Sequence, residues 1–234
     1  MKTITSIDLL EAAAYALISE RCRPSYLHDV RGGLQAVHGA IELLVRAAKD
    51  PGNAALAEKA AGLARSAMLN HEKSLVELLE QIAPRHELAT AINVGELVGD
   101  TLQFVRNDAA SKSITLRLQR SPDLNVLAEA HKFRFLILGL TITLTDGLPG
   151  GTIVDVKVMR SDTHVLIEFS SIVACASILR PEDLLGSGRQ LPSPPELILS
   201  LTRAWASANG GSVELTADSQ SPNAVRLYYP LAVA

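Results

Sequence analysis

The strongest constraint on the fold is a regular apolar pattern between residues 27 and 44. Six apolar residues recur at spacings of 3, 4, 3, 4 and 3, the seam of a heptad repeat: Leu27, Val30, Leu34, Val37, Ile41 and Leu44. The segment Asp50-Pro51-Gly52-Asn53 then breaks the helix, and Asn53 is well placed to cap a second one. The pattern therefore predicts a long helix followed by a sharp turn.

A second apolar stripe follows this turn and completes a helical hairpin. Its six residues are Leu56, Leu63, Ala67, Leu75, Leu78 and Ile82. Because a connection this short joins antiparallel neighbours, the two helices should lie side by side. Two helices alone cannot bury both stripes, so we expect two copies of the hairpin to pair as a four-helix bundle in a homodimer.

Another helical stretch precedes the hairpin. Its apolar face comprises Ile7, Leu10, Ala14 and Leu17. The register fails at Arg21 and Pro24 and restarts one residue out of phase at Leu27, which predicts a break or kink near Pro24. The pattern leaves open whether this stretch joins the bundle or folds elsewhere.

The composition changes near residue 84, where β-branched runs, glycine pairs and prolines replace a helical composition. The predicted strands are Ile114–Gln119, Thr152–Met159, Val165–Ser170, Ser212–Thr216 and Val225–Tyr229. The predicted helices are Val94–Ala110, Ala130–Thr145 and Pro195–Ala208. Strands interrupted by whole helices favour an α+β sandwich, a sheet with helices on one face. We therefore expect an α+β protein with a helical dimerisation domain over 1–84 and an α/β sandwich domain over 85–234.

Composition argues against several classes of partner. The net charge is −3 and only nine of 234 residues are aromatic, so neither a basic field nor a stacking platform for nucleic acid is expected. The longest uncharged apolar stretches, Phe135–Thr145 and Phe169–Leu179, are too short to span a membrane. The first residues lack the apolar core of a signal peptide, and two distant cysteines form neither a disulfide framework nor a zinc site. We expect a cytoplasmic protein.

The strongest candidate for a reactive side chain is His28. On the heptad, Leu27 and Val30 face the bundle core, so His28 lies just off the seam and should reach solvent. A solvent-facing imidazole can act as a nucleophile toward phosphorus. Asp29 can accept the proton on the other ring nitrogen and keep the attacking nitrogen unprotonated. The alternative is an exposed histidine on an ordinary helix.

The residues on either side of His28 and Asp29 extend this interpretation. Arg21, Arg23 and Arg31 would surround the site with positive charge, which favours a phosphoryl group and an acidic partner surface. The pair Gly32-Gly33 weakens the helix and permits a bend beside the histidine.

The segment from His28 to Leu34 resembles the phosphoacceptor box of sensor histidine kinases. That box has His, an acid, an apolar residue, Arg or Lys, Asn or Thr, Pro and Leu. The matching residues are His28, Asp29, Val30, Arg31 and Leu34. Gly32 stands where the Asn or Thr used for phosphatase activity would be, and Gly33 replaces the helix-kinking Pro. The resemblance implies phosphoryl acceptance on His28, with Asp29 as its acid/base partner and Arg31 as a phosphoryl or partner contact.

The second half of the chain resembles the ATPase domain of the same family. Phe135–Ile153 looks like the first ATP-box helix and the strand after it, Ala208–Leu215 like a late helix end with its Gly-Gly turn, and Val225–Pro230 like the last strand. The positions that would contact nucleotide differ. Thr143 occupies the position of the Asn that holds magnesium, and Gly139 occupies the position of its upstream companion. The Asp that reads adenine would be near Ser171, and the Gly-x-Gly phosphate turn would be at Glu196–Leu199. These departures predict that ATP binding is lost.

Other candidate residues are given structural interpretations. His38 is interpreted as a partly buried helix histidine, and His71-Glu72 repeats the His-acid pair on the second helix without the rest of the box. Gly186-Ser187-Gly188-Arg189 is interpreted as a surface loop, and Trp205 as a residue of the sandwich core. His86, His131 and His164 stand alone, without metal-ligand spacing.

Two functions from different classes follow from the resemblance. In the first, the protein is a histidine phosphotransferase that accepts a phosphoryl group on His28 from the receiver domain of a response regulator and passes it to another. No cofactor is then needed, and magnesium is expected on the partner regulator. In the second, the protein is a pseudokinase that binds or sequesters a response regulator or a kinase. An active but divergent histidine kinase is a third, less favoured function.

Overall fold

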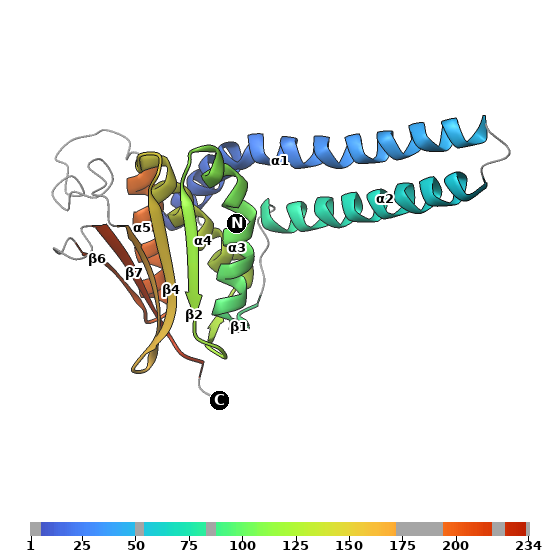
Figure 1. Cartoon of the computed structure of the whole chain (residues 1–234). Helices are drawn as coiled ribbons and strands as arrows, with labels where there is room; N and C mark the ends of the chain where they lie inside the picture. Colours follow the sequence, from blue (N-terminus) through green and yellow to red (C-terminus); the bar gives the residue numbers. More distant parts are fainter. Residues whose placement is uncertain (1–5, 50–53, 83–87, 172–193, 217–222, 233–234) are drawn as a thin grey trace. The chain divides into compact units, whose positions relative to one another are not determined.

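The computed structural model of the chain describes residues 6–49, 54–82, 88–171, 194–216 and 223–232. Within these ranges two long helices are followed by a mixture of strands and helices (Figure 1). The predicted turn at residues 50–53 and the glycine-rich loop at residues 186–189 lie outside the described residues.

The two long helices are α1 (Ser6–Ala48) and α2 (Ala54–Ile82), which run antiparallel in Figure 1. Helix α1 continues through Pro24, so of the predicted break or kink the break is wrong, and the kink stays a prediction. A proline inside a helix removes one backbone hydrogen bond and crowds the preceding turn. In a helix of 43 residues, the turns on both sides of that position keep their own hydrogen bonds, and the helix continues.

The chain divides into two compact units, and the division falls inside α1. The hairpin unit comprises Ser19–Ala83, and the sandwich unit comprises residues 1–18 together with Pro84–Ala234. The first turns of α1 therefore belong with the second half of the chain, a placement that the sequence pattern had left open.

The sandwich unit is built on a mixed sheet. Its strand order is β2 (Thr115–Arg120), β4 (Ile153–Ser161), β5 (His164–Ser171), β7 (Asn223–Pro230) and β6 (Ser212–Thr216). Strands β2 and β4 are parallel, and the other neighbours are antiparallel. A separate pair, β1 (Thr90–Asn93) and β3 (Asn125–Ala128), is antiparallel. All five predicted strands of the main sheet are confirmed within one or two residues, whereas β1 and β3 were not predicted.

Three helices cover one face of this sheet: α3 (Val94–Ser111), α4 (Ala130–Gly147) and α5 (Pro194–Ala208) (Figure 1). Alternate residues of β4 are buried beneath them, as expected of a sheet with one covered face. The predicted α+β sandwich is therefore confirmed, and so is the burial of Trp205. The pairing of two hairpins into a four-helix bundle remains a prediction.

The turn between α5 and β6 depends on two adjacent glycines. Gly210 has a φ of 75°, a left-handed conformation that costs glycine little. The N–H of Gly211 donates to the carbonyl oxygen of Ala206 at 2.7 Å, which closes the helix. A Cβ atom at Gly211 would collide with the carbonyl oxygen of Tyr228, so a bare backbone is required where β6 begins beside β7.

Tyr229 at the end of β7 should make the stability of the sandwich unit depend on pH in the alkaline range. Burial, reinforced by the carboxylate of Glu129, raises the pKa of Tyr229 from 10.0 to about 12. Because the folded state holds this proton more tightly, the associated stability is fully present below pH 10.0 and is lost as the pH rises through about 12. Burial and the carboxylate of Glu214 raise the pKa of Tyr228 above 10.0 as well, so a spectroscopic titration of tyrosinate should show both tyrosines ionising late. In Tyr229→Phe the absorbance change near pH 12 should fall by the amplitude of one tyrosine, and an unchanged amplitude would contradict the assignment.

Candidate functional site

His28 lies on α1 within the hairpin unit, and its side chain is exposed. Arg31 is exposed as well and follows three residues later, so the two side chains share one face of the helix. The side chain of Asp29 lies outside the described part of the structure. Of the three residues expected to act together, the structure thus brings His28 and Arg31 onto one accessible face.

The net positive charge near His28 is smaller than a count of Arg21, Arg23 and Arg31 suggests. The guanidinium of Arg23 forms an ion pair with the carboxylate of Glu20 at 3.2 Å. Arg21 is half-buried, whereas Arg31 is exposed. We conclude that Arg31 is the better placed of the two exposed arginines to meet an incoming anion, because the charge of Arg23 is already balanced by Glu20.

The hairpin unit leaves a stripe of apolar side chains uncovered beside His28. Leu27, Leu34 and Ile41 are 61%, 55% and 48% exposed, and they are seven residues apart. On α2, Leu63, Leu69 and Val76 are about half exposed as well. Half of the heptad seam therefore packs within the hairpin, and the other half faces outward.

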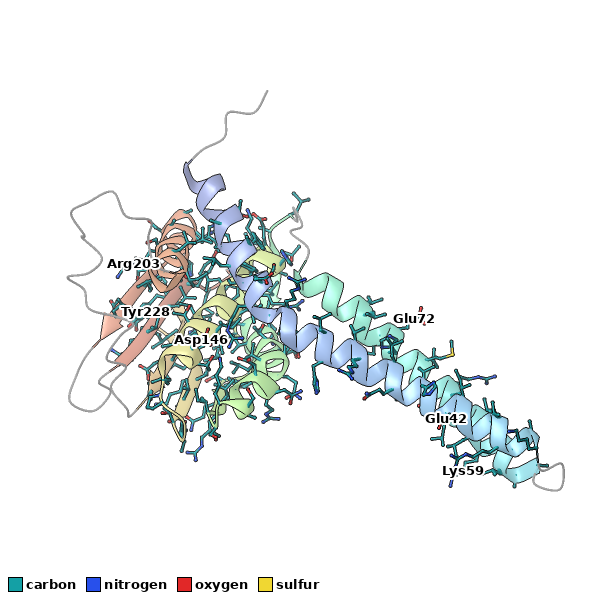
Figure 2. The ribbon with its side chains drawn as sticks, turned by 90° about the horizontal axis from the view of Figure 1, so that it is seen from above. Glu42, Lys59, Glu72, Asp146, Arg203 and Tyr228 are labelled. Carbon is teal, nitrogen blue, oxygen red and sulfur yellow. The ribbon has the colours of Figure 1, made fainter. Side chains whose placement is uncertain are left out.

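The other histidines of the hairpin lie in different surroundings. His38 is exposed, and its Nε2 atom lies 3.3 Å from the carboxylate of Glu42. The interpretation of His38 as partly buried is therefore wrong, because the heptad seam turns away from that position. His71 is half-buried against α1 at Gly33, and Glu72 beside it is exposed on α2 (Figure 2).

Three of the positions that the resemblance assigns to nucleotide contacts, Gly139, Thr143 and Ser171, lie in the described part of the sandwich unit. A Cβ atom at Gly139 on α4 would lie 2.8 Å from the Cδ1 atom of Ile18 and 3.1 Å from the Cγ2 atom of Ile198. Thr143 is half-buried, and Ser171 is buried at the end of β5. Two branched side chains therefore close over the bare backbone of Gly139.

The first turns of α1 pack along α4. The ring of Tyr15 lies 3.8 Å from that of Phe135, centroid to centroid, and is parallel to the imidazole of His131 at 5.8 Å. The carboxylate of Glu11 is 3.9 Å from the ammonium of Lys132. Among residues 11–18, whose side chains the structure describes, Ala14, Tyr15 and Ile18 are buried, whereas Leu17 is 38% exposed. The predicted apolar face is therefore wrong for Leu17.

Neither metal ligands nor a membrane helix is found in the ranges that the structure describes. Within them, no three side chains of His, Cys, Asp or Glu gather in a way that could hold a metal ion. No helix there is both long and apolar enough to cross a membrane.

Comparison with known proteins gives one sequence relative and many structural neighbours. The sensor histidine kinase ZraS of Klebsiella oxytoca is 27% identical over 133 residues, which cover 56% of this chain and 28% of that protein. The chain therefore spans less than a third of the length of this relative. No family model matches the sequence.

The structural neighbours share the fold at low sequence identity. The catalytic domain of histidine kinase ThkA has a TM-score of 0.53 at 14% identity, and the match covers 62% of this chain and 96% of that domain. A histidine kinase from Burkholderia phymatum has a TM-score of 0.51 at 17% identity, with 98% of this chain and all of that chain covered. These likenesses show that the chain shares the fold of histidine kinase catalytic domains, and the sequence relative is itself a sensor histidine kinase, as the resemblance of the acceptor box leads us to expect.

Proposed function

We propose that the protein is a histidine phosphotransferase of a two-component phosphorelay, with His28 as the residue that carries the phosphoryl group. The observation that supports this most is the exposure of His28, on a helical hairpin, within a sequence that matches the acceptor box of the family. A buried imidazole could not meet the active site of a second protein, whereas this one is accessible.

The reaction requires one bond to form and one to break. A ring nitrogen of His28 attacks the phosphorus of an aspartyl phosphate on a receiver domain, and the carboxylate of that aspartate leaves as the N–P bond forms. Asp29 would accept the proton on the other ring nitrogen, and Arg31 would contact phosphoryl oxygens or the acidic receiver surface. The reverse reaction with a second receiver returns the phosphoryl group to an aspartate. Magnesium would be held by the receiver.

ATP is not the donor in this proposal. Thr143 offers a short hydroxyl in place of an amide, and Gly139 offers no side chain at all. The side chains of Ile18 and Ile198 lie over Gly139, where apolar groups cannot replace the water that surrounds a triphosphate. These features support a sandwich unit that serves as a structural and docking module.

A second copy of the chain is the proposed partner of the hairpin. The outward stripe of Leu27, Leu34 and Ile41 has the seven-residue spacing of a helix-packing seam. Covering it with the same stripe of a second hairpin would bury both and give the homodimeric four-helix bundle. His28, one position beyond Leu27, would lie at the margin of that interface.

The test is a comparison of phosphoryl donors. Receiver domains labelled with radioactive acetyl phosphate are mixed with the full chain, and a parallel sample receives labelled ATP. We expect label from at least one receiver and none from ATP. Labelling by ATP would contradict the proposal in favour of an active kinase. Receiver binding without transfer would favour the binding-only pseudokinase.

A further inference from the structure

Gly33 and Gly39 both lie inside α1, but their surroundings differ. A Cβ atom at Gly39 would have no neighbour within 4 Å. At Gly33, a Cβ atom would lie 2.9 Å from the Cγ atom and 3.0 Å from the Cε1 atom of His71 on α2. Real Cβ atoms essentially never approach other atoms this closely, so Gly33 is a bare position because the imidazole of His71 occupies the space beside it.

His71 presents its Nδ1 edge to α1. This atom is buried, and within the described residues it has no hydrogen-bond partner. The ring is therefore held there by its shape and packing rather than by a directed polar contact.

The side of α1 that meets α2 carries three small residues beside the inward half of the heptad seam. Gly33, Ala40 and Ala47 are seven residues apart, and both alanines are buried, as is Ala60 on α2. Small residues at heptad spacing let two helices approach closely. Beside these small residues, the ring of His71 packs on the backbone of Gly33. This contact depends on the shape of the ring and fixes the position of α2 relative to α1.

We propose that His71 is a positioning residue for phosphoryl transfer at His28, a role that rests on the proposed function. Gly33 follows His28 by five residues on the same helix, a rise of about 7.5 Å. By seating its ring on Gly33, His71 sets the local path of α1 and thereby the place at which His28 meets the receiver. Group transfer is sensitive to such placement, since a displacement of about 1 Å can cost a hundredfold in rate.

The experiment compares four full-length proteins with the wild type: His71→Ala, Gly33→Ala, the double variant, and Gly39→Ala as the matched glycine control. Each is mixed with a receiver domain labelled by radioactive acetyl phosphate, over a range of receiver concentrations. The initial rate of label transfer gives a maximal rate and a half-saturating concentration, and thermal unfolding is followed by circular dichroism.

His71→Ala should lower the maximal rate by roughly tenfold to a hundredfold and leave the half-saturating concentration unchanged, because reactive geometry changes and the docking surface does not. Gly33→Ala should lower both the rate and the melting temperature, since its methyl group displaces the ring. The double variant should recover melting temperature relative to Gly33→Ala. Gly39→Ala should transfer at the wild-type rate and melt roughly 1–4 °C higher.

Some outcomes would overturn only the positioning role of His71, and another would overturn the proposed function as well. If the wild type is labelled and His71→Ala is labelled at the same maximal rate, the positioning role is wrong while His28 remains the acceptor. If the wild type takes no label from any receiver, the proposed function fails and the positioning role fails with it. A change in half-saturation alone would assign His71 to docking instead.

Discussion

Replacement of His28 by alanine is expected to reduce phosphoryl acceptance by roughly a thousandfold or more, because removal of a nucleophile leaves no group to form the covalent intermediate. The measurement is label transfer from a phosphorylated receiver domain to the full-length protein. The substitution is on an exposed face of α1, so helix content and melting temperature should stay near those of the wild type.

His38→Ala is the matched control for this variant. His38 is also exposed on α1 and lies ten residues further along, where its ring contacts Glu42 instead of an acceptor-box neighbour. This variant should accept label at the wild-type rate. Equal labelling of His28→Ala and the wild type would show that another residue carries the phosphoryl group, and label retained in His28→Ala but lost in His38→Ala would move the site to His38.

Ile18→Ala is expected to destabilise the sandwich unit by about 2–4 kcal/mol, the usual cost of truncating a buried isoleucine. Ile18 is 4% exposed, and its Cδ1 atom lies over the backbone of Gly139, so little can move into the vacated space. The melting temperature should fall by roughly 4–16 °C.

Leu17→Ala provides the comparison for this effect. Leu17 precedes Ile18 on the same turn of α1, but it is 38% exposed, and its truncation should change stability by about 0.5 kcal/mol or less. Urea unfolding followed by the fluorescence of Trp205, which lies near Phe135, measures both variants. Similar losses in the two variants would mean that the first turns of α1 do not pack on α4 in solution.

The sequence predicts the regular elements well where the apolar pattern is long or alternates regularly. The helix over Ala130–Thr145 and the strand over Ser212–Thr216 agree closely with α4 and β6. Strands β1 and β3 were missed because each has four residues and a mixed composition, with Asn and Ala positions that carry little β-propensity. Their pairing is decided by the tertiary structure.

Contacts between distant segments account for the remaining differences. The burial of Tyr15 and Ile18 is set by contacts with α4, more than a hundred residues later, so the local pattern placed Leu17 instead of Ile18 inside. The acceptor box identifies His28 from residues adjacent in sequence. The contact of His71 with Gly33 crosses from one helix to the other, and the only local signal for it is a glycine inside a helix.

The packing of α1 on the sandwich unit also has a consequence for synthesis. Tyr15 and Ile18 leave the ribosome early, but the helices against which they pack, α4 and α5, are completed only near residues 147 and 208. At about 5–20 residues per second, Ile18 waits on the order of ten to forty seconds for Ile198. During that interval an apolar patch of the nascent chain is uncovered, so a chaperone that shields early helical segments should raise the yield of folded protein.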